Sequence, residues 1–435
     1  TLDDYAKQKA AGPSGQDEES GDPESAEQGE DRLDWQGIFR EQEDEARKRP
    51  WAEEEFPELA AWLEQNEKPL ELVVEASQRE RFYAPLVPPT QPPPVINALM
   101  PGYQPWRRAC AALAMRAMLR LNDGETEEAW QDLLACHRLA RLVGQAPTVI
   151  GALVANAIDG IACSDDAAVA QHGNLTAEQA RRFRADLRKL DPLPDMVDRI
   201  DVAERFMLLD AVTSMARDGP AAMEGLAGSG EEESPATSPF SQRAANAAFE
   251  WDELLRMANA HYDRLVEAGR IADRRQRAEA VEELSEQMEE EFDRSSNLGS
   301  LAKSFLTKGP RKTVTEKIGQ ILLALMTPSL SAALQSEDRA AMTFQITEVA
   351  MALAGYRADH GSYPERLDQL VPEYREEVPL DLFVEGALQY EASGRDYLLY
   401  SVGPNREDEE GRTYDSDPPG DDIVIRTTPP EEPDD

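Results

Sequence analysis

The densest group of chemically capable side chains in this 435-residue chain is an acidic stretch near its C-terminus, residues 403–422. Eight of the eighteen residues from Asn405 onward are aspartate or glutamate, and the stretch lies between two segments with strand-like alternation. Carboxylates held this close together repel one another unless a cation gathers their oxygens. The stretch therefore predicts either a site for a hard cation or a loop of solvated charges.

Two pairs of adjacent carboxylates, Asp165–Asp166 and Asp421–Asp422, could supply the acid and the base of a hydrolase. No HExxH, GxSxG or phosphate-binding glycine motif accompanies them. In a chain this acidic, neighbouring carboxylates are expected to lie on the surface. We therefore predict no catalytic residues and no enzymatic activity, and an uncharacterised hydrolase is kept as the second alternative.

The remaining metal-type ligands are few. His137 lies on a predicted helix, where a core histidine bonded to a backbone carbonyl is expected more often than a ligand or a base. Cys110, Cys136 and Cys163 all lie in apolar helical patterns and are predicted to be small buried hydrophobes. A Cys110–Cys136 disulfide across two paired helices is the alternative in an oxidising compartment.

Net charge limits the partners of the protein. The chain carries 85 acidic and 45 basic residues, a formal net charge of −40. A field of that sign repels nucleic acid and anionic membranes and attracts basic partners, so we predict protein partners and no nucleic acid. No run approaches the roughly 18–20 consecutive apolar residues that span a bilayer. Membrane contact is therefore expected only through an N-terminal anchor upstream of Thr1.

Composition divides the chain into segments. The N-terminal residues 1–34 and the stretch 218–246 are polar and can bury too little apolar surface to offset the entropy of ordering. Residues 85–94 contain six prolines, which favours a polyproline II strut. In chain order we predict a disordered acidic arm (1–34), an α-helical domain (35–217) with the strut at 85–94, a flexible low-complexity linker (218–246), a long charged helix and connector (247–316), an α+β module (317–428) and an acidic tail (429–435).

Residues 104–215 carry the clearest helical periodicity. Apolar residues recur every three or four positions on both sides of a predicted turn at Asn122–Gly124. This pattern indicates a helical bundle or a short solenoid, and a groove within residues 104–215 that binds a peptide or small ligand is the alternative function. A long, charge-rich helix is predicted from Trp251 to Phe292. The predicted helices of the region span 106–121, 125–143, 148–172, 176–190 and 202–215.

The C-terminal module is predicted to be one long helix followed by three short strands. The helix runs from Ile318 to His360, with an apolar half, Pro328, and then an amphipathic half. Gly361 can adopt a positive φ and Pro364 cannot continue a helix, so the helix is expected to end there. The strands are predicted at 388–390, 396–403 and 422–425, with the second in the centre.

This order of elements, with Tyr-Arg-Ala-Asp-His-Gly-Ser-Tyr-Pro at 356–364, resembles the major pseudopilin and type IV pilin family over about a quarter of the chain. The resemblance implies that the second half of the helix packs against a small antiparallel sheet. It also implies a calcium ion in the acidic loop, after the Leu-Tyr-Ser-x-Gly run at 399–403. Matched onto this chain, the implied ligands are Asn405, Asp408, Asp415, Asp417, Asp421 and Asp422.

This chain departs from the family in its N-terminal extent. Some 317 residues precede the module, and Glu316 lies just outside the apolar half of the helix rather than within it. We therefore predict a mainly α protein with a pilin-like α+β module that does not polymerise as a pilus does. Its predicted role is that of a non-enzymatic, extracytoplasmic structural or interaction protein in an envelope or secretion-type assembly, with Ca²⁺ as a structural cofactor.

Overall fold

The computed structural model describes Tyr5, Val95 and residues 35–87, 103–218, 249–296 and 304–427. Apart from Tyr5, the predicted N-terminal acidic arm lies outside the described residues, and so do most of the strut, the low-complexity linker after Asp218 and the acidic tail. Within them, the protein is mainly helical and has one small antiparallel sheet, as the sequence predicts.

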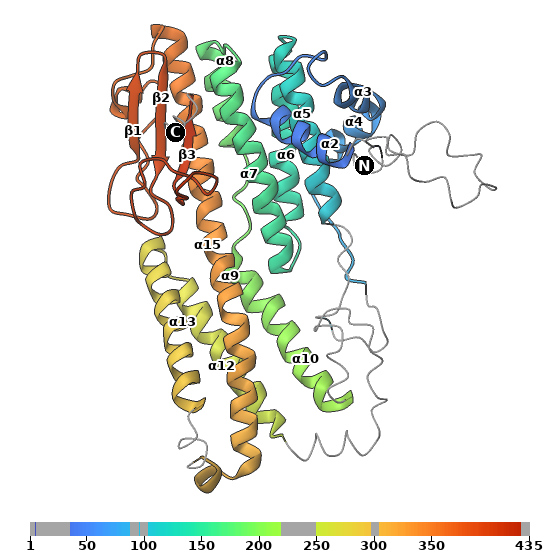
Figure 1. Ribbon diagram of the computed structural model, residues 1–435, viewed down its shortest axis with the longest axis vertical. Coiled ribbons are helices and arrows are strands. Elements are labelled where there is room, and N and C mark those ends of the chain that lie inside the picture. The colour runs from blue at the N-terminus through green and yellow to red at the C-terminus, as the bar shows by residue number, and fades with distance from the viewer. Residues whose placement is uncertain are drawn as a thin grey trace, which may run out of the picture.

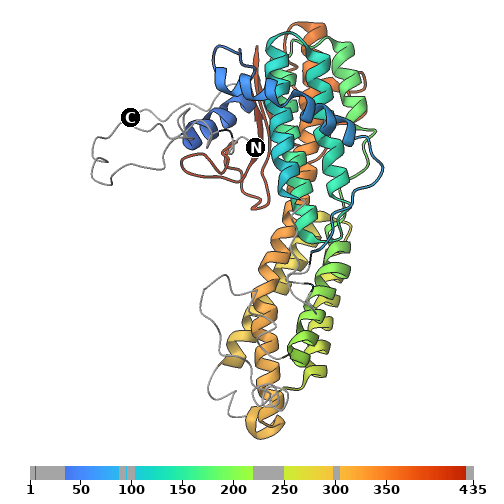
Figure 2. The same cartoon turned by 90° about the vertical axis from the view of Figure 1, so that its right-hand side faces the viewer.

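The described part of the chain is elongated, with a wide body at one end and a narrower arm of helices at the other (Figures 1 and 2). One helix of 51 residues, α15 (Pro310–His360), runs through both. Two hydrophobic cores match this division: the body core includes the second half of α15, and the arm core includes its first half. The helix therefore ties the two parts together.

The body is a helical bundle in which residues close in sequence form the turns and helix caps. Gly124 turns the α5–α6 hairpin with a φ of 82°. Thr176 caps α8 by accepting a hydrogen bond from the backbone N–H of Gln179 at 3.2 Å. The body helices are α2 (Trp35–Lys48), α3 (Pro57–Gln65), α4 (Glu67–Ala76), α5 (Gln104–Asn122), α6 (Thr126–Val143), α7 (Val149–His172) and α8 (Ala177–Leu187).

The arm contains two helices where the sequence predicts one. The helix expected from Trp251 to Phe292 ends at Gly269, and a second helix begins at Arg274. Asp273 explains the break, because its carboxylate accepts a hydrogen bond from the backbone N–H of Gln276 at 2.9 Å and caps the new helix. The arm elements are α9 (Met196–Arg199), the π-helical η2 (Ile200–Glu204), α10 (Arg205–Asp218), α12 (Trp251–Gly269) and α13 (Arg274–Ser296).

Helix α15 begins at Pro310 rather than at the predicted Ile318, so the expected module boundary near residue 317 lies inside the helix. It continues through Pro328 and ends at Gly361, whose φ is 77°, as predicted. Among the described helices it is the one that is long and apolar enough to cross a membrane by length and composition. In its most apolar 18-residue stretch, 35% of the residues are buried in the protein. The sequence analysis finds no such segment because polar residues interrupt the apolar run.

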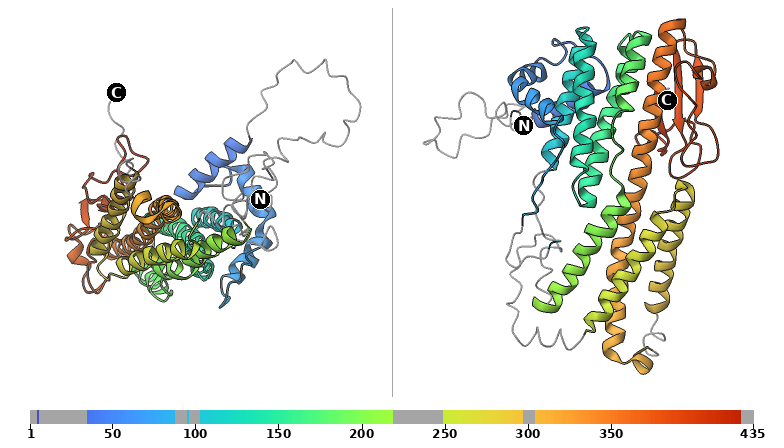
Figure 3. Two further views of the ribbon diagram at one scale, coloured as in Figure 1. Left: turned by 90° about the horizontal axis from the view of Figure 1, so that it is seen from below. Right: turned by 180° about the vertical axis from the view of Figure 1, so that it is seen from behind.

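The sheet lies against the upper half of α15 (Figure 3) and has the order β1-β2-β3, with β2 in the centre as predicted. Leu399 of β2 pairs with Tyr390 on one side and with Ile425 on the other. Tyr363 and Leu367 are buried just after the end of α15. The elements are η4 (Leu367–Leu370), β1 (Gln389–Ser393), β2 (Asp396–Ser401) and β3 (Ile423–Arg426).

Candidate functional site

The body holds a buried cluster of charged side chains where α6, α7 and α15 meet. The imidazole of His137 lies between two carboxylates, with Nδ1 2.6 Å from Asp159 Oδ1 and Nε2 3.0 Å from Asp166 Oδ2. All three side chains are at most 1% exposed. Burial alone lowers the pKa of His137, but the two carboxylates raise it to about 9. His137 is therefore a cation at neutral pH.

Arg141, one helical turn after His137, supplies a second cation. Its Nη1 donates to Asp159 Oδ1 and to the backbone carbonyl of His137, and its guanidinium lies 5.3 Å from the centre of the Phe344 ring on α15. Burial raises the pKa of Asp159, but His137 and Arg141 outweigh burial and hold it below its usual value. Burial raises the pKa of Asp166, which His137 lowers only in part. We name these four residues the buried charge network.

Asp165 lies beside this network but outside its hydrogen bonds. Its side chain is 1% exposed, and neither carboxyl oxygen has a hydrogen-bond partner among the described residues. Burial raises the pKa of Asp165 to about 8, against a smaller opposing effect of Arg47. Asp165 is therefore protonated at neutral pH, which spares the core an unpaired charge.

Two expectations about these residues need correction. The prediction that Asp165 and Asp166 lie on the surface is wrong, because this part of α7 is buried on nearly every side. His137 is a core residue as predicted, but its partners are carboxylates and not a backbone carbonyl. Since solvent does not reach the Asp165–Asp166 pair in this structure, a substrate could not reach it either.

The buried charge network also contains the one compact group of metal-type ligands within the described residues. Ligand atoms of His137, Asp159 and Cys163 lie within 4.8 Å of one another. However, Arg141 and His137 already place positive charge on the Asp159 carboxylate. Burial also raises the pKa of the Cys163 thiol well above its usual value, which disfavours the thiolate form that binds metals. The donor set does not fit a divalent cation.

The three cysteines are free and buried, as the sequence predicts, and no disulfide joins Cys110 to Cys136. Cys136 Sγ lies 3.6 Å from the backbone carbonyl oxygen of Cys110, so the two helices do approach each other at this point. The thiols therefore act as small core residues in this structure.

The acidic loop, residues 403–422, leaves β2 and returns into β3. At its neck the backbone of Gly403, with a φ of 70°, passes so close to Asp421 that an added Cβ would lie 2.3 Å from the Asp421 carbonyl oxygen. Asp421 Oδ2 accepts from the backbone N–H of Asn405 at 3.2 Å, and Asp422 Oδ2 accepts from that of Gly411 at 2.7 Å. The structure thus brings Asn405, Asp421 and Asp422 together.

Glu409 joins this group, although the sequence analysis does not single it out. Its two carboxylate oxygens accept from the side-chain amide of Asn405 and, at 3.3 Å, from the backbone N–H of Asp421. The spacing of four residues between Asn405 and Glu409 was the sequence feature that could have indicated their contact. Burial raises the pKa of Asp422 to about 6, and Glu409 adds to the rise. Burial likewise raises the pKa of Asp421.

Two buried carboxylate oxygens at the neck have no partner within the described part of the chain. The Oδ1 atoms of Asp421 and Asp422 are buried and have no hydrogen-bond partner among the described residues, and Asp422 is 4% exposed. A cation that prefers oxygen would satisfy these atoms and reduce the repulsion from Glu409.

The other predicted ligands lie away from the neck. Asp408 is exposed and accepts from the Tyr400 hydroxyl at 3.0 Å and from the backbone N–H of Glu410 at 2.9 Å. Asp415 and Asp417 are exposed, and their side chains make no hydrogen bond or ion pair with the described residues. The six predicted ligands therefore divide into three at the neck and three elsewhere on the loop.

A buried carboxylate holds the start of the loop to the sheet. Asp381 accepts from the backbone N–H groups of Phe383 and Val402, at 2.9 and 3.0 Å, and from the Ser401 hydroxyl at 3.0 Å. These bonds fix the end of β2 immediately before Gly403. Asp381 is therefore a positioning residue for the neck, and the sequence analysis does not single it out.

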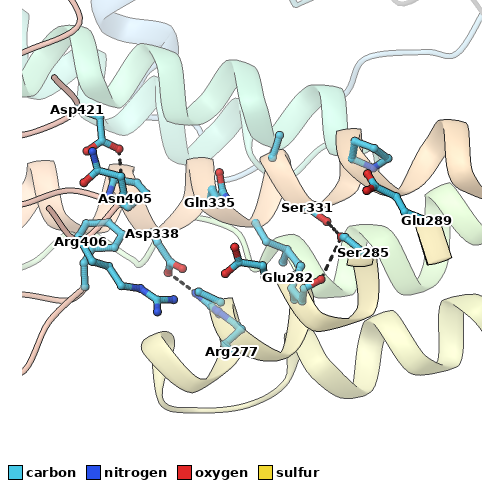
Figure 4. Close-up of a pocket in the computed structure, with 17 residues that line it drawn as sticks. Arg277, Glu282, Ser285, Glu289, Ser331, Gln335, Asp338, Asn405, Arg406 and Asp421 are labelled. Carbon is cyan, nitrogen blue, oxygen red and sulfur yellow. Dashed lines mark hydrogen bonds and ion pairs between the residues drawn. The ribbon is translucent and has the colours of Figure 1, made fainter. Parts of the chain in front are cut away.

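A cleft of about 850 Å³ lies where the arm meets the body, between α13, α15 and the start of the acidic loop (Figure 4). Asn405 and Asp421 form part of its wall, so the neck of the loop is accessible from it. A second cleft of about 270 Å³ is lined by residues between Glu43 and Met115. It overlaps the predicted groove at 104–215 only along α5.

Comparison with known proteins adds no relative. No family model, no curated protein and no solved structure matches the chain. The function is therefore argued from the side chains themselves.

Proposed function

We propose that this protein is a non-enzymatic structural or interaction protein with a pilin-like C-terminal module, and that it acts outside the cytoplasm in an envelope or secretion-type assembly. One observation carries the proposal. The second half of α15 packs against a three-stranded antiparallel sheet whose central strand leads into an acidic loop. The pseudopilin resemblance implies this combination of helix, sheet and loop.

The placement of the ionisable groups supports a role without catalysis. The acid–base groups with the most altered environment, His137 and Asp165, lie in the closed core of the body, where they stabilise or strain the fold. The carboxylates of the acidic loop, in contrast, include exposed ones such as Asp408, Asp415 and Asp417. Groups arranged in this way suit binding rather than the transformation of a substrate.

The acidic loop has a structural role in this proposal. Asp421 and Asp422, with Glu409 and Asn405 beside them, would hold a hard cation such as Ca²⁺ at the neck. The ion would supply positive charge between like-charged oxygens, and it would hold the two ends of the loop together where β2 and β3 meet.

Thermal unfolding of the full chain in EDTA and in Ca²⁺ tests this role. We expect Ca²⁺ to raise Tm, because a ligand that binds only the folded state at 100 times its Kd stabilises by about 2.7 kcal/mol. The shift should disappear in Asp421→Asn/Asp422→Asn and persist in the matched control Asp415→Asn/Asp417→Asn. A shift that both variants retain, or no shift in the wild type, would contradict the assignment.

Fractionation of cells that produce the native gene product tests the wider function. We expect the protein in the envelope or periplasmic fraction, and we expect external protease to cleave it after the outer barrier is permeabilised. Recovery in the cytosolic fraction, together with a cytosolic marker enzyme, would overturn the proposed location while leaving the cation site to be judged by its own experiment.

A further inference from the structure

The cleft between α13 and α15 combines an open, elongated shape with a polar lining. Its volume of about 850 Å³ is far larger than an ion requires and falls within the range of pockets that hold organic ligands. Its apolar floor includes Val281, Leu334 and Phe383. A ligand that fills it must therefore be extended and must offer both polar groups and some apolar surface.

Most charged groups in the wall are already paired. Arg277 is held by Asp338 and by Glu337, Arg406 Nη1 lies 3.3 Å from Glu279, and Asp421 lies 3.7 Å from Arg339. Two carboxylates are the exception: Glu282 and Glu289 line the cleft from α13, on either side of Ser285, and make no ion pair or hydrogen bond with the described residues (Figure 4). The unbalanced charge of the cleft is therefore negative.

We propose that this cleft binds an extended basic segment of a partner protein, with two lysine or arginine side chains, three residues apart, paired to Glu282 and Glu289. The inference rests on the proposed function, in which the chain works by binding other proteins, and it names the chemical class of one partner. The net charge of −40 would attract such a segment from a distance.

The spacing of the two glutamates selects the conformation of the segment. Seven residues of α-helix separate them by about 10.5 Å along the axis. A polyproline II segment repeats every three residues with a rise of about 3.1 Å, so its residues i and i+3 lie on one face about 9.3 Å apart. In a β-strand, residues on one face lie about 6.8 or 13.6 Å apart, which fits less well. The partner segment is therefore of the polyproline II type.

The cleft also offers a donor for an exposed backbone carbonyl of such a segment. Gln335 on α15 is exposed, and its side-chain amide makes no hydrogen bond with the described residues. Arg277, in the same wall, is 8% exposed, and its buried Nε–H has no acceptor among the described residues. A polyproline II backbone makes no internal hydrogen bonds, so its carbonyls are free to accept from the Gln335 amide.

Fluorescence anisotropy with the full chain at about 150 mM salt tests the proposal. The probe is a labelled nine-residue proline- and alanine-rich peptide with lysines at positions 3 and 6. We expect Glu282→Gln/Glu289→Gln to weaken its binding about three- to twenty-fold, because two solvent-exposed ion pairs are lost. The matched control, Glu283→Gln/Glu286→Gln, removes the same charge from positions of α13 that do not line the cleft, and it should bind as the wild type does.

Two further probes complete the test. A peptide with lysines at positions 3 and 5 should bind more weakly than the probe with lysines at 3 and 6, and spermidine should compete only poorly because it lacks carbonyl groups. Equal losses in the two double variants, no dependence on lysine spacing, or no binding of the 3,6 probe would each overturn the proposal. Failure here would leave the cellular location and the Ca²⁺ shift unchanged, so it is distinguishable from failure of the proposed function.

Discussion

Two regions of this protein concentrate carboxylates, and they manage the charge in opposite ways. In the buried charge network, Asp159 and Asp166 each contact a cation of the chain, and the neighbouring Asp165 stays neutral. At the neck of the acidic loop, Asp421 has one cation, Arg339, at 3.7 Å, and Asp422 accepts from the backbone N–H of Gly411, with Glu409 beside both. Both regions leave carboxylate oxygens without a partner among the described residues, but the first lies in a closed core, whereas the second adjoins a cleft.

This difference shows where ligand binding can be sought in a very acidic chain. Charge density alone does not mark a site, because the network in the body is dense in charge and sealed. A shortage of compensating cations is more informative, and in the described part of the chain it occurs at the neck of the loop and along the adjoining cleft. Each prediction below changes one of the two regions, and the substitutions are compared with a matched control position.

The largest expected effect is in the body. His137→Ala removes the hydrogen-bonded cation of Asp166 and leaves Asp159 with Arg141 among the described residues, and removal of one partner from a buried ion pair costs about 3–5 kcal/mol. Urea unfolding should therefore show a large loss for His137→Ala and a loss below about 1 kcal/mol for His360→Ala, whose side chain is exposed. Equal losses in the two variants would mean that the network does not stabilise the body.

The pH dependence of stability tests the same region. The pKa of His137 is raised to about 9 from 6.5, and that of Asp165 is raised to about 8 from 3.8. In both cases the folded state keeps a proton that the unfolded chain releases at lower pH, so stability falls as pH rises. The His137 contribution is complete below pH 6.5 and is lost by about pH 9, and the Asp165 contribution falls between about pH 4 and 8.

Replacement of Asp165 by asparagine isolates its share of this slope. Between about pH 5 and 7 a carboxyl with this shift lowers the free energy of unfolding by about 1.4 kcal/mol for each pH unit, and the slope falls to about half of this at pH 8. Urea unfolding at pH 6, 7 and 8 should therefore show a flatter profile for Asp165→Asn than for the wild type. The exposed control Asp191→Asn should keep the wild-type slope, and an unchanged slope in Asp165→Asn would show that this carboxyl does not titrate in that range.

The distance in sequence between contacting residues explains how far the sequence could predict the structure. Periodicity located α5 to α8, and turn chemistry located the turn at Asn122–Gly124 and the helix end at Gly361, because both depend on residues close in sequence. The break before Arg274 was missed because one aspartate creates it. The partners of His137 were missed because they come from another helix at positions 159 and 166, and only packing decides that adjacent aspartates are both buried. At the neck, Asn405 and Asp421 were identified from the resemblance, while Glu409 required the fold of the loop.

The smallest expected effect concerns the neck of the loop. Gly403 and Gly394 both have positive φ, 70° and 63°, but an added Cβ would lie 2.3 Å from the Asp421 carbonyl oxygen at Gly403 and would meet nothing within 4 Å at Gly394. Both alanine variants carry the backbone cost of a positive φ, so their difference measures the close approach alone. We expect Gly403→Ala to be about 1–2 kcal/mol less stable than Gly394→Ala, because the neck must shift to relieve the contact. If the neck is a cation site, Gly403→Ala should also weaken the Ca²⁺-dependent rise in Tm, whereas Gly394→Ala should retain it. Equal behaviour of the two variants would mean that cation binding does not depend on the close approach of Asp421 to Gly403.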